Sequence, residues 1–131
     1  MIIKKYKIQN KIRGYISTHF DDNEGQDIFT VYAGNLNKGN DKFLGSFYDK
    51  KACEDFAEGY FSQLKKLEDE SRQLIKAEKK LYAKRQQLIE KYSKNYTQSI
   101  SENEFAEIDR ILQEYAFRLS CLNLYRKTFI D

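Results

Sequence analysis

The sequence is poor in the residues that build metal centres and disulfide frameworks. It contains two cysteines (Cys53 and Cys121), one histidine (His19), no proline and no tryptophan. The cysteines form no C-x-x-C pair, and a single histidine cannot complete a zinc site with them. We therefore expect no metal, no cofactor and no disulfide, and we interpret both cysteines as small buried residues in a reducing compartment.

Long apolar runs are also absent. No run approaches the ~20 residues that a membrane-spanning helix needs. The first residues, MIIKKYK, hold only two isoleucines before the lysines begin, which does not fit a signal peptide. We therefore predict a cytoplasmic protein without a membrane partner. Its 131 residues, 40% of them hydrophobic, suit one folded domain or one small domain with a helical extension.

The first 48 residues have the pattern of short strands joined by turns. Four segments are rich in β-branched and aromatic residues: IIKKYKI (2–8), GYISTHF (14–20), DIFTVYAG (27–34) and KFLGSF (42–47). The connectors DDNEGQ and NLNKGND are dense in Asn, Asp and Gly, which tolerate the positive φ angles of hairpin turns. The pattern predicts an antiparallel sheet of three or four strands.

A helical pattern begins after the last strand. Asp49 is a good N-cap, only Gly59 interrupts the helix before a predicted turn at 95–100, and the capping box Ser101-x-x-Glu104 starts a second helix. The apolar stripes consist of Leu67, Leu74, Leu81 and Leu88 on the first helix and Phe105, Ile108, Leu112, Tyr115, Leu119 and Leu122 on the second. We predict an α+β fold: a sheet with the start of the long helix in 1–62, and an antiparallel, coiled-coil-like helical hairpin in 63–131.

The hairpin is expected to need a further partner. Ser71, Glu78 and Arg85 interrupt its leucine repeat. Four apolar residues lie outside its two stripes, namely Ile111, Phe117, Leu124 and Phe129. Either the sheet or a second chain covers them, and we predict a homodimer that forms through the hairpin.

One segment resembles a known DNA-binding module. A strand, a hairpin and a strand that ends in Leu44-Gly45-Ser46-Phe47, followed at once by a helix, resemble the DNA-binding domain of plant ethylene-response factors and the arm-binding domains of phage integrases. The resemblance covers residues 12–62 and includes Arg13-Gly14. It implies three antiparallel strands packed on one helix, with Gly45 allowing the helix backbone to come close. The helix residues that it turns toward the sheet are Ala52, Phe56 and Ala57.

The DNA contacts of that family are largely missing here. The family reads DNA with arginines on the exposed face of its sheet, because arginine can donate two hydrogen bonds to guanine. Only Arg13 is of that type. Ser17, His19 and Ala33 stand near positions where the family has basic or DNA-contacting side chains, and the neighbouring acidic residues would repel phosphate. The resemblance therefore implies a module that has lost most of its DNA contacts.

No arrangement of residues indicates an enzyme. His19 has no serine or cysteine nucleophile beside it with an orienting acid, and the sequence has no glycine-rich phosphate loop. Tyr125-Arg126 superficially resembles a recombinase nucleophile, but the chain is too short to hold such a catalytic domain. We expect no enzymatic activity and assign no catalytic residue.

Composition and charge favour an inhibitor that binds another protein. Seventeen lysines against six arginines, with many Asn, Ile and Tyr, are typical of AT-rich genomes and of small proteins from bacterial phages and mobile elements. We expect an inhibitor that binds a bacterial nucleic-acid enzyme, similar to an anti-CRISPR protein on a CRISPR nuclease, with acidic side chains that block a basic channel. The candidate partner-binding residues are Asp21, Asp22, Glu24 and Asp27, together with Glu68, Asp69 and Glu70.

The alternative is a protein that binds DNA or RNA directly. Residues 1–20 carry five basic and no acidic residues, and 72–94 carry eight basic against two acidic ones. The candidate nucleic-acid-binding residues are Lys4, Lys5, Lys7, Lys11 and Arg13, together with Arg72, Lys76, Lys79, Lys80, Lys84 and Arg85. A solvated helix face would also explain the second cluster. A purely structural coiled-coil protein is the remaining alternative.

Overall fold

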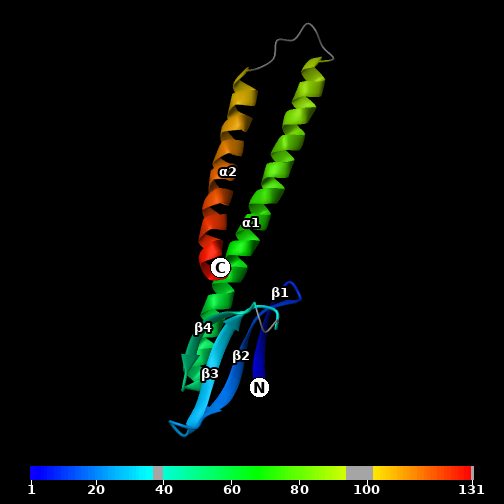
Figure 1. Ribbon diagram of the computed structural model, residues 1–131. Coiled ribbons are helices and arrows are strands. Elements are labelled where there is room, and N and C mark those ends of the chain that lie inside the picture. The colour runs from blue at the N-terminus through cyan, green and yellow to red at the C-terminus, as the bar shows by residue number, and fades with distance from the viewer. Residues whose placement is uncertain (37–39, 94–101, 131) are drawn as a thin grey trace. The chain divides into compact units, whose positions relative to one another are not determined.

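The computed structural model describes residues 1–36, 40–93 and 102–130. The chain forms two compact units, one of residues 1–66 with 127–131 and the other of residues 67–126. Its elements are four strands followed by two long helices, so the predicted α+β class is confirmed (Figure 1).

The strands form one antiparallel sheet. β1 (Ile2–Ile8), β2 (Lys11–Asp21), β3 (Gln26–Ala33) and β4 (Lys42–Phe47) lie in the order β1-β2-β3-β4, so each strand pairs with the next one in the sequence. β1 and β2 are joined by Gln9 and Asn10, whose φ angles of 53° and 64° suit a two-residue hairpin turn. All four predicted strands are therefore present, in the simple meander that short turns between them favour.

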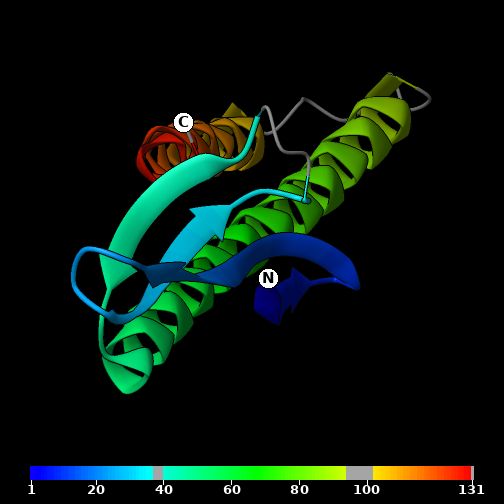
Figure 2. The ribbon, with the colours of Figure 1, turned by 60° about the horizontal axis from the view of Figure 1, so that its bottom comes forward.

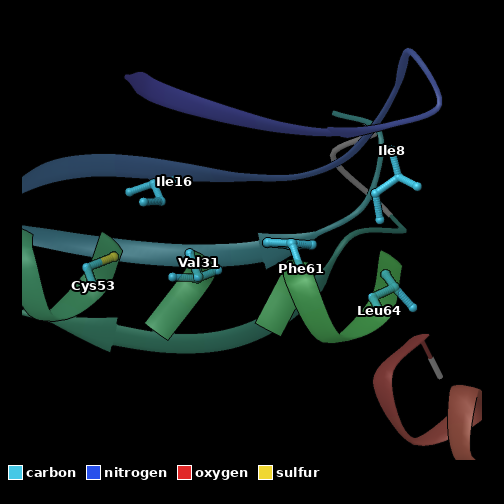
Figure 3. Close-up of a cluster of buried hydrophobic side chains, with 7 residues drawn as sticks. Ile8, Ile16, Val31, Cys53, Phe61 and Leu64 are labelled. Atoms are coloured by element: carbon cyan, nitrogen blue, oxygen red, sulfur yellow. The ribbon is translucent and has the colours of Figure 1, made fainter. Parts of the chain in front are cut away.

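The core of the first unit lies between the sheet and the N-terminal part of α1 (Lys50–Ser93). Asp49 caps this helix as predicted, since its Oδ1 accepts a hydrogen bond of 3.1 Å from the backbone N–H of Lys51. The first turns of α1 lie along one face of the sheet (Figure 2). The side chains buried there are Ile8, Ile16, Val31, Cys53, Ala57, Phe61 and Leu64 (Figure 3). Each large one contributes about 1.5–3 kcal/mol by leaving water.

The face of α1 that meets the sheet differs in part from the prediction. Ala57 is buried as expected, but Ala52 is exposed and Phe56 keeps 40% of its surface exposed. The buried stripe begins at Cys53 and continues in steps of four and three residues to Leu64. Ala52 and Phe56 each precede a buried position by one residue, which turns them about 100° round the helix axis.

The close approach between sheet and helix occurs at Gly14 on β2 and not at Gly45 on β4. A Cβ atom on Gly45 would lie 3.4 Å from the ring of Phe47, which is an ordinary contact distance. A Cβ atom on Gly14 would lie 1.8 Å from Cζ of Phe61, so the phenyl ring fills the space of the missing side chain. The prediction for Gly45 is therefore wrong in two respects. The close approach is at Gly14 on β2, and the side chain of Phe61 approaches this glycine instead of the helix backbone.

The second unit contains the C-terminal part of α1 and most of α2 (Glu102–Ile130), and it confirms the predicted helical hairpin. Its buried residues are Leu67, Ser71 and Leu74 on α1 and Ile108 and Leu112 on α2. The remaining residues of the two predicted stripes are half-buried. The seven-residue repeat on α1 and the 3-4 spacing on α2 therefore mark the sides on which the two helices meet.

Arg85 interrupts the leucine repeat because it pairs across the hairpin. Its Nε donates a hydrogen bond of 2.9 Å to Oδ1 of Asp109, and its guanidinium carbon lies 5.6 Å from the centroid of the Phe105 ring. Near the distal end, the Tyr92 hydroxyl donates a hydrogen bond of 3.3 Å to Oε2 of Glu104. At Arg85 and Tyr92, polar side chains of α1 therefore contact α2 directly.

The two cysteines lie in different surroundings. Cys53 is buried, as predicted, but Cys121 is exposed, so the prediction of burial is wrong for Cys121. Cys121 lies between Leu119 and Leu122 in the sequence but off the stripe that these residues form. Within the described ranges, no helix is long and apolar enough to cross a membrane. The predictions that fall outside the described residues concern the turn at 95–100, the hydroxyl of Ser101 and the side chain of Phe129.

Candidate functional site

The structure brings four of the predicted acidic residues together at one end of the sheet. The β2–β3 turn carries them, and the pairing of Phe20 with Asp27 and of Asp21 with Gln26 brings both sides of the turn together. We call this surface the acidic tip and define it as Asp21, Asp22, Glu24 and Asp27. Sequence proximity alone indicated this grouping, and the strand register confirms it.

Asp21 holds the turn in place. Its Oδ1 accepts a hydrogen bond of 3.0 Å from the backbone N–H of Asn23, and its Oδ2 accepts one of 3.2 Å from the hydroxyl of Tyr48. The backbone carbonyl of Asp21 also accepts a 2.8 Å hydrogen bond from the N–H of Gly25, whose φ of 66° suits a glycine. Asp21 is therefore mainly structural, which leaves the other three carboxylates for binding.

Asp22, Glu24 and Asp27 are exposed, and within the part of the chain that the structure describes they have no hydrogen bond or ion pair through their side chains. Two aromatic side chains stand beside them with 58% and 50% of their surface exposed, Phe20 and Tyr48. The hydrogen bond to Asp21, followed by slight desolvation and the charges of Asp21 and Glu24, raises the pKa of Tyr48. Negative charge and exposed aromatic surface are therefore combined at the acidic tip.

The two aromatic residues beside the acidic tip, Phe20 and Tyr48, were missed by sequence reasoning. Phe20 stands in an alternating strand and Tyr48 just before the N-cap of α1, two places where aromatic residues are usually core. One feature of the sequence could have indicated that Phe20 is exposed: it lies at the end of its strand, directly before two aspartates. α1 begins at Lys50, two residues after Tyr48, and both aromatic side chains stay exposed.

The second acidic group, Glu68, Asp69 and Glu70, does not form one surface. Consecutive residues of a helix point about 100° apart, so Glu68 and Glu70 lie on opposite sides of α1. Asp69 is also paired with Arg72. These three residues belong to the second unit and the acidic tip to the first, and we leave them out of the candidate site.

The structure divides the five basic residues at the N-terminus into separate groups. Lys4 donates a hydrogen bond of 3.0 Å to Oε1 of Glu58 on α1, which raises its pKa. Lys5 pairs in register with Tyr15 on β2. The other three basic residues, Lys7, Lys11 and Arg13, line a hollow of about 660 Å³ at the end of the sheet remote from the acidic tip. The N-terminal strand is therefore not one continuous basic surface.

The basic residues of α1 are divided too. Arg72 pairs with Asp69 and Arg85 with Asp109, so both arginines already have acidic partners. The remaining four are exposed and lie on one side of the helix, and we call them the lysine face: Lys76, Lys79, Lys80 and Lys84. Within the described residues their amino groups have no acidic partner within ion-pair distance.

The sheet face that α1 leaves open carries an aromatic row. Tyr15 and Tyr32 stack with ring centroids 5.3 Å apart, and Phe43 meets Tyr32 edge-on at 6.2 Å. In the register of β2, Ser17 and His19 lie on this face. Ala33 does not, because it packs against the buried core.

Comparisons with known proteins do not extend these observations. No protein-family model, curated protein or solved structure matches the chain. Among the described residues, no group of three His, Cys, Asp or Glu side chains could hold a metal ion. The resemblance of residues 12–62 to the ethylene-response-factor domain stays a prediction.

Proposed function

We propose that the protein is a non-enzymatic inhibitor of phage or mobile-element type that acts in the bacterial cytoplasm. In this proposal the acidic tip binds the basic channel of a nucleic-acid enzyme, as an anti-CRISPR protein binds a CRISPR nuclease. The observation that supports it is a group of three exposed carboxylates, Asp22, Glu24 and Asp27, which have no ion-pair partner among the described residues and lie beside exposed Phe20 and Tyr48.

Physical chemistry links this surface to such a partner. A channel that binds nucleic acid is lined with lysine and arginine, and carboxylates can take the place of phosphates on those side chains. Opposite charge also speeds the encounter of the two proteins. Phe20 and Tyr48 supply rigid apolar area of the kind that dominates the energy of protein interfaces.

The test is inhibition of nucleic-acid cleavage by purified CRISPR nucleases loaded with guide RNA. We expect the wild-type protein to slow cleavage, and we expect Asp22→Lys with Glu24→Lys to weaken inhibition at least tenfold by placing like charges against the channel. Asp21 stays intact because it holds the turn.

The matched control is Glu90→Lys with Glu107→Lys, which makes the same change in net charge at exposed positions of the helices. This control should inhibit like the wild type. Equal loss in both variants would show that only net charge matters. Unchanged cleavage with wild-type protein would contradict the inhibitor proposal.

The lysine face favours a second candidate function, direct binding of DNA or RNA. Fluorescence anisotropy of labelled duplex DNA and structured RNA, titrated with protein at low and moderate salt, tests it. If phosphates are bound, affinity should fall steeply with salt, and Lys79→Glu with Lys80→Glu should weaken binding and flatten the slope. The Asp22→Lys, Glu24→Lys variant should then bind more tightly. Absence of binding at low salt would leave the lysine face as a solvated helix surface.

A further inference from the structure

We propose that the hollow lined by Lys7, Lys11 and Arg13, the basic hollow, is a binding site for a small organic phosphate. It lies at the end of the sheet where β2 begins, whereas the acidic tip lies where β2 ends. The basic hollow contains no residue of the acidic tip or of the lysine face, so binding there is tested independently of the proposed function.

The β1–β2 hairpin places the three cations round the hollow. Its two-residue turn pairs Ile8 with Lys11, which brings the two lysines to either side of the turn. The register then shifts: Lys7 pairs with Ile12 and Tyr6 with Gly14, so Arg13 has no opposite residue on β1. Lys11 and Arg13 lie two residues apart on β2, and both line the hollow together with Lys7 of β1.

The opposite wall is built from Gly34, Asn35, Asn40 and Asp41, which follow β3 in the sequence. The N–H of Gly34 donates a 2.9 Å hydrogen bond to the carbonyl of Arg13. A Cβ atom on Gly34 would lie 1.8 Å from Oδ1 of Asp41, so glycine is needed for the Asp41 side chain to pack there. Tyr15 then holds that carboxylate with a hydrogen bond of 2.6 Å. Two hydrogen bonds and one close packing contact thus keep the wall beside the cations.

The lining has the chemistry of a phosphate site. Three cationic side chains stand against one carboxylate, Asp41, which leaves a local charge of +2. Arginine can donate two parallel hydrogen bonds to a phosphate and lysine supplies a point charge. The amides of Asn10, Asn35 and Asn40 add neutral donors and acceptors.

The size and the remaining lining specify the rest of the ligand. About 660 Å³ is within the range of sites for small molecules and exceeds what one phosphate ion needs. Ile12, Ala33 and Leu64 contribute apolar surface to the hollow. A phosphate group with an attached organic part, of about the size of a nucleoside monophosphate, therefore fits this site better than a free phosphate ion does.

The experiment is a titration of the isotope-labelled full chain, followed by amide chemical shifts. Adenosine monophosphate and inorganic phosphate serve as separate probes, and adenosine serves as the uncharged control. We expect adenosine monophosphate to shift the amides of Lys11, Gly34 and Asn35 at lower concentration than phosphate does, and adenosine to cause no shift there.

Two variants locate the site. Lys7→Gln with Lys11→Gln removes two exposed charges from the hollow and should weaken binding at least tenfold, with an otherwise unchanged spectrum. The matched control, Lys5→Gln with Lys51→Gln, removes the same charge elsewhere in the first unit and should bind within twofold of the wild type. Arg13→Lys keeps the charge but loses the paired donors, and it should weaken binding severalfold.

Three results would overturn the proposal. The first is no shift at the hollow with millimolar adenosine monophosphate. The second is equal weakening in the hollow variant and in the control, which would mean general charge attraction. The third is a shift confined to the amides of residues 76–84, which would place phosphate binding on the lysine face instead. Tighter binding of inorganic phosphate than of adenosine monophosphate would contradict the proposal that the ligand carries an organic group.

Discussion

At the scale of single residues, the contact between Gly14 and the ring of Phe61 decides how closely α1 packs on the sheet. The ring occupies the place where a side chain on β2 would start, so any residue other than glycine there would require the Phe61 ring or the helix to shift. Gly45 is a natural comparison, because it lies in strand β4 and a Cβ atom there would make only ordinary van der Waals contacts.

We predict that Gly14→Ala lowers the free energy of unfolding by about 1–3 kcal/mol or more, because the added methyl group overpacks the core. Gly45→Ala, the matched control, should change it by less than about 1 kcal/mol and can raise it by restricting the unfolded chain. Urea unfolding followed by circular dichroism measures both. Equal effects would contradict the packing described at Gly14.

Tyr15 gives the protein a pH dependence at the alkaline end. Burial, followed by the hydrogen bond to Asp41 and the negative charge of Asp41, raises the pKa of Tyr15 to about 12. A folded-state pKa above the ordinary value of 10.0 means that this stabilisation is complete below pH 10 and is lost as the pH rises toward 12.

We therefore predict that the stability of the wild type falls between pH 10 and pH 12, and that Tyr15→Phe flattens this part of the profile. The variant should also lose about 1–3 kcal/mol at pH 8, because its hydrogen bond to a carboxylate is gone. Asp41→Asn should move the tyrosinate absorbance of Tyr15 to lower pH. An unchanged profile in Tyr15→Phe would assign the alkaline transition to other groups.

At the scale of elements, α1 is one continuous helix with two kinds of surroundings. Between Cys53 and Leu74 a buried side chain recurs every three or four residues, whereas none of the residues from 75 to 93 is buried. On α2 the described residues that are buried are Ile108 and Leu112, close in sequence to the Phe105 and Asp109 contacts of Arg85. The heptad pattern continues along both helices, but the depth of packing does not.

We predict that amide hydrogens of residues 75–93 exchange faster than those of residues 53–74, because none of the side chains of residues 75–93 is itself buried, whereas a buried side chain recurs every three or four residues from 53 to 74. Hydrogen exchange measured by mass spectrometry on the full chain separates the two segments. Equal protection at low protein concentration would mean that something else covers residues 75–93, and a protection that rises with protein concentration would identify a second copy.

At the scale of the whole molecule, charge and apolar surface are both unevenly distributed. The acidic tip and the basic hollow occupy opposite ends of one sheet, and the lysine face belongs to the other unit. Phe117 and Leu124 on α2 keep 71% and 66% of their surface exposed, with the smaller Ser120 and Cys121 between them in sequence. In an antiparallel pair of α2 helices, Phe117 of each copy would meet Leu124 of the other.

We propose that this stripe of α2 forms the predicted homodimer, and we expect Phe117→Ser with Leu124→Ser to shift the sedimentation coefficient from dimer to monomer. Ile75→Ser with Ile89→Ser, at less exposed apolar positions of α1, is the control and should leave the dimer intact. Crosslinking through exposed Cys121 should link two wild-type chains. A wild-type monomer at all concentrations would refute the dimer.

Much of the fold follows from the sequence alone. The alternation in the first 48 residues, the N-cap at Asp49 and the heptad repeat are local patterns, and each depends on residues close together in the chain. Their outcome is four strands and two helices within a few residues of the predicted bounds. The acidic tip was predictable for the same reason, because one turn carries all of its carboxylates.

Tertiary structure alone decided which distant residues meet. Phe61 fills the space at Gly14, and Glu58 forms an ion pair with Lys4. Asp109 forms an ion pair with Arg85, and loop residues complete the basic hollow. These pairings depend on the register of each strand and on the rotation of each helix about its axis. A shift of one residue in the pairing of a strand moves its side chains to the other face of the sheet. A shift of one residue along a helix rotates its side chains by about 100° about the helix axis. Composition and spacing within one segment specify neither the register of a strand nor the rotation of a helix relative to its neighbours. They therefore identified the charged residues of this protein but not the surfaces that those residues form.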